Sequence, residues 1–281
     1  MIFNKIIMED TTIDIYLHFN RDNKISAKKV IDSDKYELFT EENVFDKLNS
    51  KQKRQINKAL ITVSKQYNEL FDIYGLCDKR NDNKLKVILL SGKYKRAKRL
   101  SGFIYRASKK DEGRNIIYIN VENILKDGNK KGNNIEKETE RVLRHETVHS
   151  IINDNIINGK IEKAPTLWIE EGLAESSNLI NGYNRFYATS TDMVLKSKYY
   201  FGVNLIEYLY LKNNKDNGIF KDIIKNSSGN KAIKEAGNKA GIKGSFKDII
   251  KFWVKEKYGA DDKSAENFLE DFKLNKRYKT W

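Results

Sequence analysis

The first third of the chain shows the alternating pattern of β-strands, followed by one long helical pattern. Between 13 and 19 apolar residues alternate with polar ones, which predicts a half-buried strand, and 35–39 is a candidate to pair with it. His18 lies on the polar side of this alternation, so we expect a surface residue rather than a ligand. Apolar residues recur at helical spacing over 50–74, and Gly75 supplies a stop, which predicts a helix.

Three further strands are predicted between 85 and 121. The apolar run 87–90 predicts a short buried strand over 85–90, and strands follow near 102–107 and 115–121. The sequence Asp-Glu-Gly at 111–113 predicts the turn between the last two strands. The segment 127–134 is rich in Gly, Asn and Lys, so we expect a flexible loop there.

From 137 onward the pattern is almost entirely helical. Acidic residues followed by an apolar stripe predict a helix from about 137 to 153, and Pro165-Thr166 is a suitable entry to the next helix. We therefore expect an α+β protein. An N-terminal β-rich element at 1–48 precedes a larger domain at 49–281. That domain has a small mixed sheet with helices in its N-terminal lobe, about 49–153, and a mostly helical C-terminal lobe, about 154–281.

The length and composition are those of a globular protein. Of the 281 residues, 39% are hydrophobic, which is ample for a core, and no apolar run approaches the roughly eighteen residues of a membrane span. Residues 1–10 are too short and too quickly acidic for a signal peptide, so we expect a cytoplasmic protein, or a secreted one whose leader has been removed. The single cysteine, Cys77, excludes an internal disulfide and is expected to be a small buried residue.

The net charge of +14 raises the question of nucleic-acid binding. Lysines are spread over the whole chain, with clusters at 93–99 and 273–279, which indicates a general lysine bias. No zinc-finger, phosphate-loop or RNA-binding aromatic signature accompanies them. The patterns therefore argue against a nucleic-acid partner, and 93–99 is expected to be a solvated loop.

Two histidines and a glutamate lie at metal-site spacing within the predicted helix 137–153. His145 and His149 are four residues apart, so both imidazoles project from one helix face, and each can bind a metal. Glu146 lies at the edge of that face, where it can contact a metal-bound water as general base. The alternative is two ordinary histidines with backbone or carboxylate partners. With only three histidines in the chain, this spacing is rare by chance, which favours the metal site.

Two histidines leave a catalytic zinc site incomplete, because such a site generally has three protein ligands and one exchangeable water. The stretch 168–175, Trp-Ile-Glu-Glu-Gly-Leu-Ala-Glu, supplies candidates. Glu171 and Glu175 share a helix face, while Gly172 and Ala174 are small enough to let this helix approach another closely. By itself the segment favours an exposed acidic helix face. Beside the histidine motif this preference reverses, and a metal ligand is favoured.

Together these two motifs resemble the gluzincin zinc metallopeptidases, in particular the peptidase MA-like group related to aminopeptidase N and thermolysin. The resemblance implies that Glu171, directly before glycine, is the third zinc ligand rather than Glu170. It also implies that Glu175 orients the first ligand, His145, although thermolysin-like enzymes have Asp there. The 21 residues between His149 and Glu171 are slightly more than usual for the class, which implies a longer loop.

A third similar motif begins at Tyr199. The sequence from Tyr199 to Gly202 resembles the Tyr-x-x-Gly helix of the same enzymes, which implies that Tyr199 donates a hydrogen bond to the oxyanion of the reaction. The alternative is a structural tyrosine, since the chain contains fifteen. The helical patterns at 232–240 and 245–253 are similar to the closing pair of helices of the family, so the resemblance spans roughly 50–260.

In gluzincins the strand before the metal helix forms the edge on which an extended substrate lies. The resemblance assigns that role to five consecutive residues: Ile116, Ile117, Tyr118, Ile119 and Asn120. The segment 120–123, Asn-Val-Glu-Asn, is similar to the motif with which aminopeptidases hold a substrate amino terminus, but it lacks the small residues that precede it there. An endopeptidase is therefore favoured slightly over an aminopeptidase.

The resemblance as a whole implies a zincin-like catalytic fold and a zinc metallopeptidase. We expect one Zn²⁺ per chain and a peptide or protein substrate, hydrolysed by a zinc-bound water that Glu146 activates. Two alternatives stay open: a catalytically silent zinc-binding interaction module of the same fold, and a basic nucleic-acid-binding protein in which the motif is accidental. The sequence leaves the oligomeric state undetermined.

Overall fold

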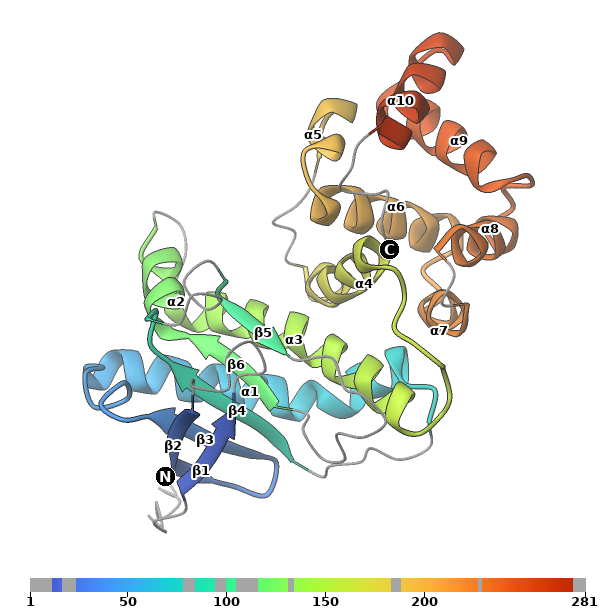
Figure 1. Cartoon of the computed structure of the whole chain (residues 1–281). Coiled ribbons are helices and arrows are strands. Elements are labelled where there is room, and N and C mark those ends of the chain that lie inside the picture. Colours follow the sequence, from blue (N-terminus) through green and yellow to red (C-terminus); the bar gives the residue numbers. More distant parts are fainter. Residues whose placement is uncertain are drawn as a thin grey trace. The chain divides into compact units, whose positions relative to one another are not determined.

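The chain divides into two compact units, each described here by itself. In the computed structural model the sheet unit comprises Met1–Asn68 and Arg80–Ser150, and the helical unit comprises Glu69–Lys79 and Ile151–Trp281. The domain boundaries expected from the sequence stay predictions. The structure describes residues 12–16, 24–77, 84–93, 100–104, 116–130, 134–182, 188–226 and 229–274 (Figure 1).

The sheet unit is built on one mixed six-stranded sheet with the strand order β1-β2-β3-β4-β6-β5. The first three strands pair antiparallel, β3, β4 and β6 run parallel to one another, and β5 is antiparallel to β6. Together with the helices that are described in the following paragraphs, this sheet confirms the α+β class. The strand bounds are β1 Thr12–Tyr16, β2 Lys24–Asp32, β3 Tyr36–Glu41, β4 Leu85–Leu90, β5 Gly102–Ile104 and β6 Ile116–Asn120.

The expected pairing of 35–39 with 13–19 is wrong. Strand β2, which the sequence analysis did not identify, lies between β1 and β3 and pairs with both. Its alternation is interrupted by Lys29, and its register with β3 shifts between Lys29 and Ile31, which weakens the period-two signal. His18 lies outside the described residues, as does the predicted turn at 111–113.

Two long helices lie along this sheet. Helix α1 (Ser50–Tyr74) connects β3 to β4, and α3 (Ile135–Ile157) follows the shorter helix α2 (Val121–Gly128) (Figure 1). Helices α1 and α3 are neighbours: Arg144 Nε of α3 donates a hydrogen bond to Gln66 Oε1 of α1 over 2.9 Å. The Tyr36 hydroxyl of β3 donates to Asn57 Oδ1 of α1 over 2.8 Å, which joins that helix to the sheet.

Part of the predicted flexible loop 127–134 is helical, because its first two residues end α2. The sequence analysis did not identify α2, whose start is capped by the Asn120 side chain. The basic cluster 93–99 is described only at Lys93, which forms an ion pair with the buried carboxylate of Glu41. Most of that predicted loop therefore lies outside the described residues.

Packing holds the short strand β5 against β6. The rings of Phe103 and Tyr118 stack with their centroids 4.9 Å apart and their planes only 5° apart. Both rings belong to a buried cluster on one side of the sheet, whose buried members are Ala27, Phe39, Ile88, Leu90, Phe103 and Tyr118. A three-residue strand makes few ladder hydrogen bonds, so this side-chain packing contributes much of what keeps β5 in place.

The helical unit confirms the expected helical pattern of the second half. Its central helix is α4, which is buried from Trp168 to Asn178. The predicted helices at 232–240 and 245–253 correspond to α8 and α9. The bounds are α4 Leu167–Ile180, α5 Thr191–Leu195, α6 Lys198–Lys212, α7 Gly218–Lys225, α8 Gly229–Lys239, α9 Phe246–Tyr258 and α10 Asp262–Leu274.

Helices α4 and α6 cross at two glycines. A Cβ atom on Gly202 would lie 2.1 Å from the carbonyl oxygen of Trp168, and one on Gly172 would lie 2.5 Å from the backbone of Gly202. The two backbones can meet this closely only because neither residue has a side chain. The crossing thereby sets the position of α4, the helix that carries Glu171.

Two further expectations can be compared with the structure. Cys77 is buried, as expected, and its sulfur lies 3.6 Å from Asn155 Oδ1. No helix within the described ranges is both long enough and apolar enough to cross a membrane.

Candidate metal centre

Helix α3 carries the two histidines and the glutamate in its buried middle part. Asn134 precedes the helix and its side chain accepts a hydrogen bond from the Lys137 amide over 2.7 Å. Glu136 and Glu138 lie in the first turn, where carboxylates interact favourably with the helix dipole. The predicted helix 137–153 is confirmed, and α3 extends further at both ends. Every residue from 141 to 156 is buried.

The two imidazoles face each other across one turn of α3. Their Nε2 atoms are 3.2 Å apart, and His145 and His149 are only 7% and 8% exposed. Two nitrogens bound to a tetrahedral zinc at 2.0–2.1 Å would be separated by about 3.4 Å. The observed separation is within about 0.2 Å of that value, so this pair can chelate one ion with little rearrangement.

Two arginine–glutamate ion pairs lie along the histidine-bearing part of α3, one buried and one part-buried. Arg144 donates to Glu140 over 2.9 Å within the helix and also reaches α1, while Arg141 pairs with Glu138 over 2.8 Å. Both arginines are less than a tenth exposed. The charge of each is therefore compensated locally. Of these contacts, only the hydrogen bond from Arg144 to Gln66 of α1 restricts rotation of α3 about its own axis.

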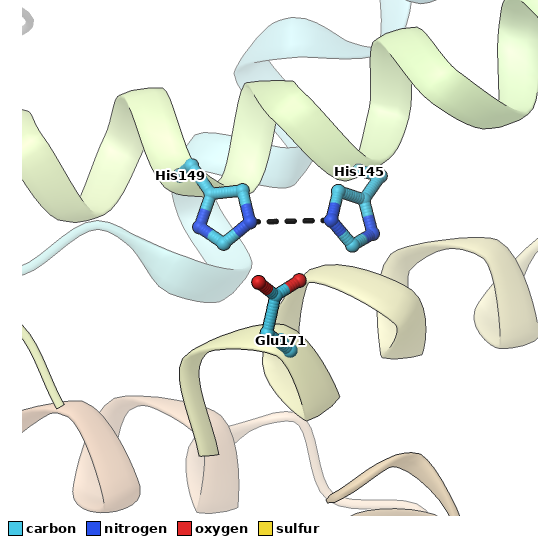
Figure 2. A group of neighbouring side chains, drawn as sticks. All are labelled: His145, His149 and Glu171. Carbon is cyan, nitrogen blue, oxygen red and sulfur yellow. Dashed lines mark hydrogen bonds between the residues drawn. The ribbon is translucent and has the colours of Figure 1, made fainter. Parts of the chain in front are cut away.

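Glu171, on α4, completes the group of possible ligands. The candidate ligand atoms of His145, His149 and Glu171 all lie within 4.8 Å of one another, and all three residues are buried (Figure 2). Among the residues that the structure describes, this is the only cluster of three or more His, Cys, Asp or Glu side chains with that geometry. The structure thus brings together the three residues that the sequence analysis named as candidate ligands.

Glu146, the expected general base, is buried under strand β5. It is 6% exposed, and the backbone of Gly102 packs against its side chain and that of Val142. A Cβ atom on Gly102 would lie 3.1 Å from Glu146 Oε1, so the carboxylate lies on the side of α3 that β5 covers.

Two other expected site residues lie in the helical unit. Glu175 is buried on α4 and accepts a hydrogen bond from Asn178 Nδ2 over 3.1 Å. Tyr199 is half-buried in the first turn of α6, one turn before the crossing at Gly202. The interaction of Glu175 with His145 and the role of Tyr199 toward an oxyanion stay predictions.

The strand expected to form the edge of the sheet is not an edge strand. β6, which comprises Ile116, Ile117, Tyr118, Ile119 and Asn120, pairs with β4 on one side and with β5 on the other. Among the strands that the structure describes, β5 ends the order on this side of the sheet, and its ladder places Gly102 opposite Ile119. The expectation of an edge strand was wrong because the order of strands along the chain does not reveal that β5, which comes first, pairs with the outer side of β6.

The sequence analysis missed two residues that help to position this part of α3: Gly102, which contacts Glu146, and Arg144, which joins α3 to α1. A glycine within a predicted strand often marks a close backbone approach, and Gly102 carried that signal. Arg144 gave no such signal, because an arginine beside His145 resembles any charged residue of an amphipathic helix. Its hydrogen bond to Gln66 becomes apparent only when α1 packs beside α3.

Comparison of the sequence with models of protein families finds no match, and comparison with curated proteins finds none. The resemblance to gluzincins therefore rests on the three motifs at 145–149, 168–175 and 199–202.

Proposed function

We propose that this chain is a zinc-dependent peptidase, with one zinc ion held by His145, His149 and Glu171. The observation that carries the proposal is the buried group of these side chains, in which the two imidazole nitrogens already have the separation that suits a tetrahedral ion. Two imidazoles and one carboxylate are a donor set typical of catalytic zinc, and they leave one coordination position open.

When bound, the zinc ion supplies a Lewis acid that polarises the scissile carbonyl and makes water more acidic. Glu146 accepts the proton of the attacking water and later delivers it to the nitrogen of the leaving amine. The burial of Glu146 supports this role, because proton transfer to bulk solvent competes less in a shielded site. In the same proposal Tyr199 donates a hydrogen bond to the oxyanion, and Glu175 orients His145.

A zincin-like fold of the peptidase MA-like group is part of the proposal. Its support is the motif resemblance together with the order of elements, in which the histidine helix α3 follows a mixed sheet. An extended peptide substrate would pair with the edge strand β5 rather than with β6, since β5 ends the strand order. This edge lies directly over Glu146, which suits a substrate whose peptide bond must reach that carboxylate.

The decisive experiment combines metal analysis with peptide cleavage. The purified protein should contain one zinc per chain, and it should cleave members of a peptide library in a reaction that a chelator stops and added zinc restores. Zinc without cleavage of any peptide would instead favour a silent zinc-binding module. Absence of zinc, with no effect of the chelator, would favour the basic nucleic-acid-binding protein.

Two pairs of variants separate the roles of the residues. Glu146→Gln should retain zinc and lose about 10²- to 10⁴-fold in turnover, because it removes the base but no ligand. Its control is Glu136→Gln, at a half-buried first-turn position of the same helix far from the histidines in sequence, which should behave as wild type. His145→Ala should lose both zinc and turnover, whereas His18→Ala, which removes the remaining histidine, should lose neither. Full activity of Glu146→Gln would refute the mechanism.

A further inference from the structure

We infer that Gly102 is a positioning residue for Glu146: its missing side chain lets strand β5 lie against that carboxylate and hold it in place. This inference rests on the proposed function for its catalytic meaning. The geometry is direct. A Cβ atom on Gly102 would lie 3.0 Å from Glu146 Cγ, 3.1 Å from Glu146 Oε1 and 2.5 Å from Val142 Cγ1.

The requirement at Gly102 is for space and not for backbone conformation. Gly102 is absent from the described glycines with positive φ, so an alanine can adopt its backbone angles without strain. Carbon atoms in contact are about 3.5–4.0 Å apart, so an added methyl group would overlap Val142 by about 1 Å and Glu146 by about 0.5 Å. Either the strand or these side chains must therefore move.

The strand cannot move away easily, because the residues on either side of this position are anchored. The Asn120 amide donates to the carbonyl of Ser101 over 3.0 Å, and Asn123 Nδ2 donates to the carbonyl of Leu100 over 2.9 Å. On the other side, the ring of Phe103 stacks on Tyr118. Both sides of Gly102 are thus tied to β6 and α2.

Both overlaps must be relieved, and of the two side chains Glu146 moves more easily. Val142 is buried, and a β-branched residue in a helix has one strongly preferred rotamer, so its larger overlap can be relieved only by a small shift of the backbone. A glutamate has three rotatable side-chain bonds. At about 100° per residue, Val142 lies between His145 and Glu146 on the helix face, so β5 contacts the glutamate side of that face. A side chain at 102 would therefore displace the Glu146 carboxylate more than it displaces the ligand positions of α3.

The first test measures turnover, substrate affinity and zinc content together. Gly102→Ala should lower kcat at least tenfold, leave KM within about threefold, and retain one zinc per chain with unchanged affinity in a chelator competition. Val142→Ala alone should stay close to wild type. The double variant Gly102→Ala/Val142→Ala should recover most of kcat, because removal of the Val142 methyl groups makes room for the new one. A kcat within twofold of wild type in Gly102→Ala would overturn the inference, as would a double variant no more active than the single one.

The second test needs no activity and uses the metal-free protein. Gly102→Ala should lower the Tm of the wild type more than it lowers the Tm of Glu146→Ala, in which the obstructing carboxylate is absent. Equal shifts in the two backgrounds would show that the two residues do not touch, which overturns the inference even if the protein is a peptidase. Unequal shifts in a protein that cleaves no peptide would refute the proposed function and leave the packing of Gly102 on Glu146 intact.

Discussion

The crossing of α4 and α6 makes the sharpest prediction about stability. In Gly202→Ala the new Cβ would lie 2.1 Å from the carbonyl oxygen of Trp168, whereas ordinary contact begins near 3.4 Å. The two helices must therefore separate by roughly 1.3 Å in a region where α4 is buried on all sides. Overpacking of a core costs about 1–3 kcal/mol, and a backbone obstacle belongs at the upper end of that range.

Helix propensity opposes this cost, because alanine is favoured over glycine by about 1 kcal/mol in a helix interior. The net expectation is a loss of about 2 kcal/mol, which corresponds to a fall in Tm of about 4–8 °C for a unit of this size. Thermal unfolding followed by far-ultraviolet circular dichroism measures it. The matched control is Gly218→Ala in α7, where the nearest atoms to the new methyl group belong to the exposed side chain of Asp216, 3.2 Å away. That variant should be nearly neutral. A Gly202→Ala protein as stable as Gly218→Ala would refute the reasoning.

Three further predictions concern charges and the metal. Arg144→Met should lower the free energy of unfolding by about 1–2 kcal/mol in urea titrations, because it removes two part-buried hydrogen bonds of a buried guanidinium, one to Gln66 and one to Glu140. Hydrogen bonds from Lys29 and Lys84 hold the pKa of Asp32 below its usual value, so its contribution is present above about pH 4 and is lost as the pH falls further. The difference in Tm between wild type and Asp32→Asn should accordingly disappear in acid; a constant difference from pH 7 to pH 2 would contradict this. Zinc at 100 times its Kd should stabilise the wild type by about 2.7 kcal/mol and leave His145→Ala unchanged in calorimetry.

Elements defined by their own periodicity could be predicted from the sequence with accurate bounds. The helix expected over 50–74 is α1 (Ser50–Tyr74), and the buried strand expected over 85–90 is β4 (Leu85–Leu90). The helix pattern reflects burial of one helix face, and the strand pattern reflects burial of a whole strand. In both cases the hydrophobicity of each residue indicates whether that residue is buried. The same reasoning located α3 around His145.

Elements defined by their neighbours could not be predicted in this way. Strand β2 (Lys24–Asp32) has several lysines and was missed, although its partners on both sides confirm it as a strand. The order β4-β6-β5 was also inaccessible, because the pairing of a strand depends on contacts that are distant along the chain. That order decides which strand forms the edge and which strand covers Glu146.

The same distinction between local pattern and tertiary contact applies to the candidate site. The sequence by itself determined that His145 and His149 face each other, since four residues make one helical turn wherever the helix lies. It also named Glu171, through the motif that follows. Only the tertiary structure decided that Gly102 covers Glu146 and that Gly172 meets Gly202. Those contacts depend on backbone separations of a few ångströms between segments far apart in the chain, which local periodicity does not encode.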